Sequence, residues 1–209
     1  EASPWVDNVD ANGKTFRQRA IKGDDGKGDW LEIDNGNYKF QRRLVKANDN
    51  GPFWTEIRGE QGNVVRSRTV PARDNKGSWL EVQENNGPSR WSRSVRASDG
   101  GPPWNETLFQ SGQLRRERTV PDQHGGPDWL QQSFGNGRTQ FSRMVPAQDG
   151  GPDWAQVIDS NGITKYYRSD VPDLDGKGSW NESMVNGVLS RNRNYTDPLT
   201  GENWAESVL

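Results

Sequence analysis

Cysteine is absent from this chain of 209 residues, and histidine occurs once, at position 124. Without cysteine there is no disulfide framework, no thiol nucleophile and no thiolate-bound zinc. A single histidine argues against a catalytic or metal centre built on imidazoles. The sequence also contains no run of eighteen apolar residues, so we expect no insertion into a membrane.

Aliphatic residues are scarce, yet tryptophan is abundant. Hydrophobic residues make up only 29% of the chain, against roughly 45–50% in ordinary globular proteins. Ten tryptophans and a net charge of only −2 nevertheless argue against a disordered chain. The tryptophans must therefore be buried by some arrangement other than a deep apolar core.

Charges of both signs are interspersed along the whole chain, with 27 basic and 29 acidic side chains. No basic face is visible that would bind duplex nucleic acid. Single-stranded nucleic acid binds to aromatic and arginine side chains, but here acids in every repeat would repel its phosphates. We therefore expect no nucleic-acid partner.

Tryptophan recurs at intervals of 24 to 26 residues, and only Trp91 lies off this lattice. Such a period is the signature of a tandem-repeat protein. We predict that residues 1–209 form a single domain of eight repeats of about 25 residues, followed by a terminal strand at 204–209. The repeats start near residues 5, 30, 54, 79, 104, 129, 154 and 180.

Other residue types keep the same phase. An acidic or amide residue follows each lattice Trp by two positions, and an aspartate precedes most of them by five, with His124 replacing it once. Each repeat also has one in-phase arginine, and these are Arg19, Arg43, Arg68, Arg93, Arg118, Arg143, Arg168 and Arg193.

Each repeat is predicted to form a β-hairpin. Short runs with period two are bounded by Gly, Asn, Asp and Pro, as in strands, and pairs such as Asn35-Gly36 suit the tight turn between them. No segment shows a helical period with caps. The fold class is therefore all-β without helix.

The arrangement of the hairpins has two alternatives. Leu follows Trp30, Trp79 and Trp129 but not the intervening Trp54 and Trp104, which suggests four double repeats of about fifty residues. Four such units would make a small closed propeller or barrel-like ring, the arrangement that we favour. An open repeat array is the alternative, and it accommodates the seventeenth strand directly.

Residues two apart in a strand share a face, so each Trp lies beside its Glu and each Arg beside its Val. If the hairpin register brings the Trp-Glu residues opposite the Arg-Val residues, Glu pairs with Arg and the guanidinium covers the indole. This stacking could serve only the framework, or the same Trp could also form the floor of binding sites.

No unique acid, base or nucleophile stands out from the repeats, so we predict that the protein is not an enzyme and needs no cofactor. The acidic loops lack the ligand set of a calcium site, and no metal is expected. Repetition of one small unit favours multivalent binding. In its composition and period the chain resembles Trp-rich tandem-repeat lectins, which implies glycan partners, on a cell surface or in a polysaccharide, and a secreted or cell-surface location.

The candidate sugar sites are three Gly-Pro loops with their tryptophans, spanning 49–54, 99–104 and 149–154. In each of them Asp would accept hydrogen bonds from hydroxyl groups and Trp would cover the sugar ring. Off-lattice aromatic residues, among them Phe141, Tyr166 and Tyr167, could line these sites instead. The alternative function is a structural or adhesive extracellular repeat protein, with possible self-association. The nine predicted carbohydrate-binding residues are Asp49, Gly51, Trp54, Asp99, Gly101, Trp104, Asp149, Gly151 and Trp154.

Overall fold

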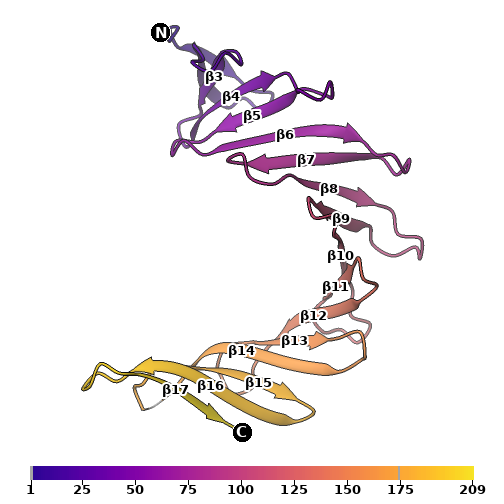
Figure 1. The fold of residues 1–209 in the computed structure, drawn as a ribbon, viewed down its shortest axis with the longest axis vertical. Helices are drawn as coiled ribbons and strands as arrows, with labels where there is room; N and C mark the ends of the chain where they lie inside the picture. The colour runs from indigo at the N-terminus through magenta and orange to yellow at the C-terminus, as the bar shows by residue number, and fades with distance from the viewer. Residues whose placement is uncertain (1, 174) are drawn as a thin grey trace. The chain divides into compact units, whose positions relative to one another are not determined.

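The computed structural model describes residues 2–173 and 175–209. It shows antiparallel β-strands throughout, arranged as an open sheet (Figure 1). The prediction of an all-β chain of repeated hairpins is confirmed. The described residues include no helix, and hence none long and apolar enough to cross a membrane.

The chain divides into two compact units, which are described separately. The first unit comprises Glu1–Val95 and Asn105–Leu114, and the second comprises Arg96–Trp104 and Arg115–Leu209. The strands up to Phe109 are β1 (Val6–Val9), β2 (Thr15–Ile21), β3 (Trp30–Asp34), β4 (Lys39–Val45), β5 (Trp54–Arg58), β6 (Val64–Pro71), β7 (Ser78–Glu84), β8 (Arg90–Val95) and β9 (Trp104–Phe109). The remaining strands are β10 (Leu114–Val120), β11 (Trp129–Phe134), β12 (Thr139–Val145), β13 (Trp154–Ile158), β14 (Thr164–Pro172), β15 (Ser179–Val185), β16 (Val188–Thr196) and β17 (Asn203–Val208).

Two kinds of link alternate along the ladder, and both join neighbouring strands. The short turn pairs β3 with β4, so that Leu31 lies opposite Arg42. The longer Gly/Pro loop then returns the chain to pair β4 with β5, with Arg43 opposite Glu56. A repeat inside the ladder therefore pairs with the repeats before and after it.

The favoured prediction of a closed propeller or barrel-like ring is wrong, and the open array is the arrangement observed. Among the described residues β1 pairs only with β2, and β17 pairs only with β16. The physical reason lies in the longer loops. In a propeller some connections lead from one blade to the next, whereas here the loop between β4 and β5 continues the same ladder.

The short turn between β15 and β16 uses the backbone that Asn-Gly favours. Asn186 and Gly187 have φ values of 52° and 79°, in the left-handed region required at both central positions of a type I′ turn. This turn matches the strand twist and sets the β15–β16 register, which pairs Val185 with Val188. Local turn chemistry thus positions each Trp strand beside its Arg strand.

Most buried side chains lie on one face of the sheet, called here the network face, which carries the in-phase Trp, Glu and Arg side chains. In β3 this face has Trp30 and Glu32, whereas Leu31 and Ile33 point to the opposite face. Among the described residues six buried hydrophobic residues stand beside eight buried charged ones. The core is therefore a thin layer of aromatic rings and paired charges.

Candidate functional site: the arginine network and its loops

Arg43 shows how one repeat is held together. Its Nε donates to Glu56 on the following strand at 2.8 Å, and its two terminal nitrogens donate to the two carboxylate oxygens of Asp25 at 2.6 and 2.5 Å. Its guanidinium carbon lies 4.1 Å from the ring centre of Trp30. One planar cation thereby joins a loop, two strands and an indole.

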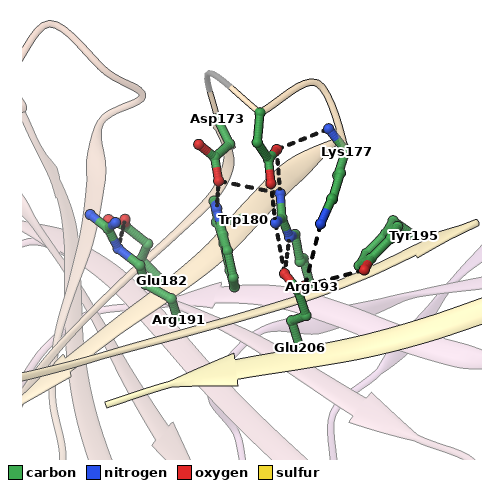
Figure 2. Close-up of polar contacts among 9 residues, drawn as sticks. Asp173, Lys177, Trp180, Glu182, Arg191, Arg193, Tyr195 and Glu206 are labelled. Carbon is green, nitrogen blue, oxygen red and sulfur yellow. Dashed lines mark hydrogen bonds and ion pairs between the residues drawn. The ribbon is translucent and has the colours of Figure 1, made fainter. Parts of the chain in front are cut away.

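The same arrangement recurs along the chain. In the last repeat Arg193 donates to Glu206 and stacks on Trp180 at 4.1 Å (Figure 2). It also donates to both carboxylate oxygens of Asp175. The predicted Arg–Trp stacking within a hairpin is therefore confirmed. The predicted Arg–Glu pairing is found between repeats and not within the hairpin, because Glu32 lies opposite Gln41 and Arg43 instead donates to Glu56 of the following repeat. The ion pairs between arginine and loop aspartate are Arg43–Asp25, Arg68–Asp49, Arg93–Asp74, Arg118–Asp99, Arg143–Asp122, Arg168–Asp149 and Arg193–Asp175.

Arginine suits this position because its flat fork can donate in several directions while one face lies on an aromatic ring. The side chain of Arg43 is only 3% exposed and that of Glu56 only 6%. Removing charges from water is costly unless they are fully paired. These arginines are therefore framework residues, and their loss would leave buried carboxylates without compensation.

The loop carboxyl groups are held in the ionised form. Hydrogen bonds from Arg68 lower the pKa of Asp49 far below its ordinary value of 3.8. Arg193 likewise lowers the pKa of Asp175 to about 2. Since the arginines stay charged throughout, these groups bind protons far less readily in the folded protein than in the unfolded chain.

Acidification is therefore expected to destabilise the protein. The stabilisation from these carboxylates is complete above the ordinary aspartate pKa of 3.8 and is lost as the pH falls through the lowered values. Urea unfolding followed by Trp fluorescence should give similar midpoints at about pH 7 and 5, and clearly lower midpoints at about pH 3 and 2. An unchanged midpoint at about pH 2 would show that the ion pairs contribute no net stability.

The predicted loop aspartates lie in the network but remain open to solvent. The terminal nitrogens of Arg68 donate to Asp49 at 2.8 and 2.6 Å, and the same pair of bonds holds Asp99 and Asp149. The three carboxylate side chains are nevertheless 55 to 57% exposed. Each loop thus displays a fixed carboxylate with its outer side in water.

The predicted glycines lie against these carboxylates. The amide of Gly51 donates to Asp49 at 3.0 Å, and Gly101 and Gly151 repeat this bond at the same distance. A Cβ atom on Gly51 would be 2.8 Å from a terminal nitrogen of Arg68. Glycine is present because the arginine and the loop backbone approach this closely.

The predicted tryptophans lie one layer below the aspartates. Arginine guanidinium groups cover Trp54, Trp104 and Trp154 at 4.2 to 4.3 Å. Trp54 is buried and the other two are half-buried. The structure therefore brings Asp and Gly together directly, and places an arginine between the aspartate and the indole.

One of these loops borders a hollow in the first unit. Asp49 and Trp54 line a depression of about 530 Å³, together with Lys46 and Arg66. Arg66 stacks on Trp54 at 4.7 Å. This depression combines a fixed carboxylate, cationic donors and the edge of an aromatic layer.

Sequence reasoning missed a substitution within the network. Where His124 replaces the in-phase aspartate, the carboxylate of Asp122 takes its place in the network and accepts a hydrogen bond from Arg143 at 2.9 Å. The available signal was an aspartate two positions earlier in the same loop. The off-lattice Phe141 and Tyr166 also belong to the framework, since they pack edge-on against Trp129 and Trp154.

The chain matches no protein-family model, and the comparisons with curated proteins and with solved structures find no significant match either.

Proposed function

We propose that this protein binds carbohydrate without transforming it, through equivalent loops in successive repeats. The observation that carries the proposal is the repeated display of a solvent-facing carboxylate, fixed by arginine, at Asp49, Asp99 and Asp149. Sugar hydroxyl groups donate well to such acceptors. Because the carboxylates are already fixed, little side-chain freedom is lost on binding.

Several equivalent loops favour multivalent binding of a glycan, in which weak individual contacts add through linkage. The loop at 49–54 borders a hollow of about 530 Å³, lined by Asp49 and Trp54, that could receive a sugar residue. Catalysis is not part of the proposal. A general acid must be protonated near the working pH, and the arginines lower the pKa values of these carboxyl groups instead.

Glycan-array binding followed by calorimetric titration tests the proposal, and two matched variants assign the sites. Asp49→Asn and Asp74→Asn each weaken one Arg–Asp pair of the network, but only Asp49 lies in a candidate sugar loop. Asp49→Asn is expected to reduce the number of bound ligands per chain, while Asp74→Asn leaves it unchanged. No binding to any of a diverse set of glycans would contradict the proposal. So would an equal effect of the two variants on the number of bound ligands.

A second candidate function is a structural or adhesive module, and one observation favours it. The recurring Trp, Glu, Arg and loop Asp all contact one another, so the framework alone accounts for the repeated motif. Trp204 on β17 is also 50% exposed, at a strand edge that is unpaired among the described residues. Concentration-dependent self-association in sedimentation experiments, together with no binding on glycan arrays, would favour this function.

A further inference from the structure

The seventh repeat departs from the others in its backbone. The β14–β15 ladder shifts register between Arg168 and Val171, and Asp170 has a φ of 58°. A bulge of this kind inserts an extra residue, bends the strand and re-aims side chains. It accounts for the interval of 26 residues between Trp154 and Trp180.

A hollow of about 660 Å³ lies beside this bulge in the second unit, within the range of roughly 300–1,000 Å³ typical of small-molecule sites. By the strand register most of its lining residues, from β12 to β16, are on the face opposite to the network face. The side chains that line it from that face are Met144, Ala155, Tyr167, Asn181, Ser183 and Asn192.

The shape of the hollow follows from the register. Ala155 lies between Met144 on one neighbouring strand and Tyr167 on the other. The small alanine forms a low floor between two larger side chains, which are 54% and 42% exposed. An apolar and aromatic surface is thus open to solvent here without an arginine covering it.

Polar groups form the other side of the hollow. Asn181 and Asn192 lie opposite each other on β15 and β16 and are exposed, so their amides face the solvent. The bulge adds Ser169 and Asp170 to the lining. Amide donors, amide acceptors, a hydroxyl and a carboxylate therefore converge beside an aromatic ring.

The charge of the hollow selects among ligands. Asp153 and Asp170 line it, and both are acidic. Arg168 also borders it, but its guanidinium already donates to Asp149 and Glu182. A negatively charged ligand would be repelled, whereas a neutral polyhydroxylated ring would meet both the aromatic surface and the hydrogen-bonding groups.

Tyr167 sets this repeat apart from the others. None of the other in-phase residues at its position is aromatic, so the aromatic surface is a local feature and not a consequence of the repeat. The equivalent residues are Gln18, Arg42, Ser67, Ser92, Glu117, Ser142 and Asn192.

We propose that this hollow is a separate binding site for a neutral pyranose, with Tyr167 covering the sugar ring and Asn181, Asn192 and Asp170 bonding its hydroxyl groups. The inference deepens the proposed carbohydrate-binding function and rests on it. It differs in location, because the site lies on the opposite face and is unique to one repeat.

The test titrates the full chain with a panel of neutral methyl pyranosides and follows backbone amide shifts by NMR. Shifts are expected in β13 to β16. Tyr167→Ala should weaken binding about tenfold or more, whereas Tyr167→Phe should change it less than about threefold, because the ring is kept. Tyr38→Ala is the matched control, since Tyr38 is 72% exposed and lies in the first unit.

Two further variants keep the test independent of folding. Asn181→Ala alters an exposed side chain, and Asp170→Gly keeps the bulge because glycine adopts positive φ readily. Each should weaken binding by about threefold or more. Glycan binding by the wild type that is unaffected by Tyr167→Ala and by both of these variants, with shifts confined to the Gly-Pro loops at 49–54 and 99–104, would overturn this inference alone. No binding to any glycan would overturn the proposed function as well.

Discussion

Arg43→Lys is expected to destabilise the first unit although it keeps the positive charge. Lysine cannot donate to Glu56 through one nitrogen and to both oxygens of Asp25 through two others, and it has no flat surface to lay on Trp30. We expect the free energy of unfolding to fall by about 2–3 kcal/mol for Arg43→Lys. For Arg43→Ala we expect a fall of about 3–5 kcal/mol, because this variant leaves the carboxylate of Glu56 buried without its cation. Urea unfolding followed by Trp fluorescence measures both.

Arg42→Lys is the matched control. Arg42 is the preceding residue in the same strand, but it is exposed and points to the opposite face. Its replacement should change the free energy of unfolding by no more than about 0.5 kcal/mol. If the two lysine variants had equal stability, the planar arginine network would not be what holds the strands together.

The strands, the turns and the stacking could be predicted because each depends on local sequence. Period two assigns Trp30 and Glu32 to one face, and Asn-Gly pairs place the tight turns. A nearly constant spacing then puts Arg43 opposite Trp30 once the hairpin is assumed. None of these steps requires knowledge of contacts between distant residues.

The role of the loop aspartates could not be predicted in the same way. Asp49 lies 19 residues before Arg68, and the contact depends on how the Gly-Pro loop folds over the neighbouring hairpin. Sequence alone left these acids as candidates for sugar hydroxyl groups. In the structure the arginine occupies one side of the carboxylate, and the other side faces water.

Closure was predicted wrongly for a related reason. A period of two residues and a period of about 25 are both compatible with a ring and with an open ladder. The register across the longer loop decides between them, because Val45 pairs with Trp54 and continues the same sheet. Register across such a loop depends on the Arg43–Glu56 contact, which the hydrophobic pattern does not encode.

The side chains on the two faces of the sheet have different roles. The network face uses its charged groups to bury Trp in a chain poor in aliphatic residues. The opposite face is not needed for that burial, and it is free to vary from repeat to repeat, as Tyr167 and the neighbouring bulge show. A ligand site that differs between repeats is more easily accommodated on this opposite face.

Trp30→Ala is expected to destabilise the first unit about as strongly as Arg43→Ala. Trp30 is 2% exposed, and the guanidinium carbons of Arg43 and Arg58 lie 4.1 and 4.2 Å from its ring centre. Removing the indole loses its buried area, opens a cavity and leaves two cations without their aromatic partner. We expect a destabilisation of about 3–5 kcal/mol, measured by urea unfolding.

The effect should also be local, because a repeat contacts only its neighbours. Amide hydrogen exchange is expected to accelerate in β3 to β5, while β15 to β17 keep their protection. Trp204→Ala is the matched control, since Trp204 occupies the same lattice position but is 50% exposed, and its loss should cost no more than about 1 kcal/mol. Equal losses of stability for the two variants would mean that contact with two arginines adds nothing to stability. Faster exchange in β15 to β17 of the Trp30→Ala variant would mean that the repeats unfold as one block.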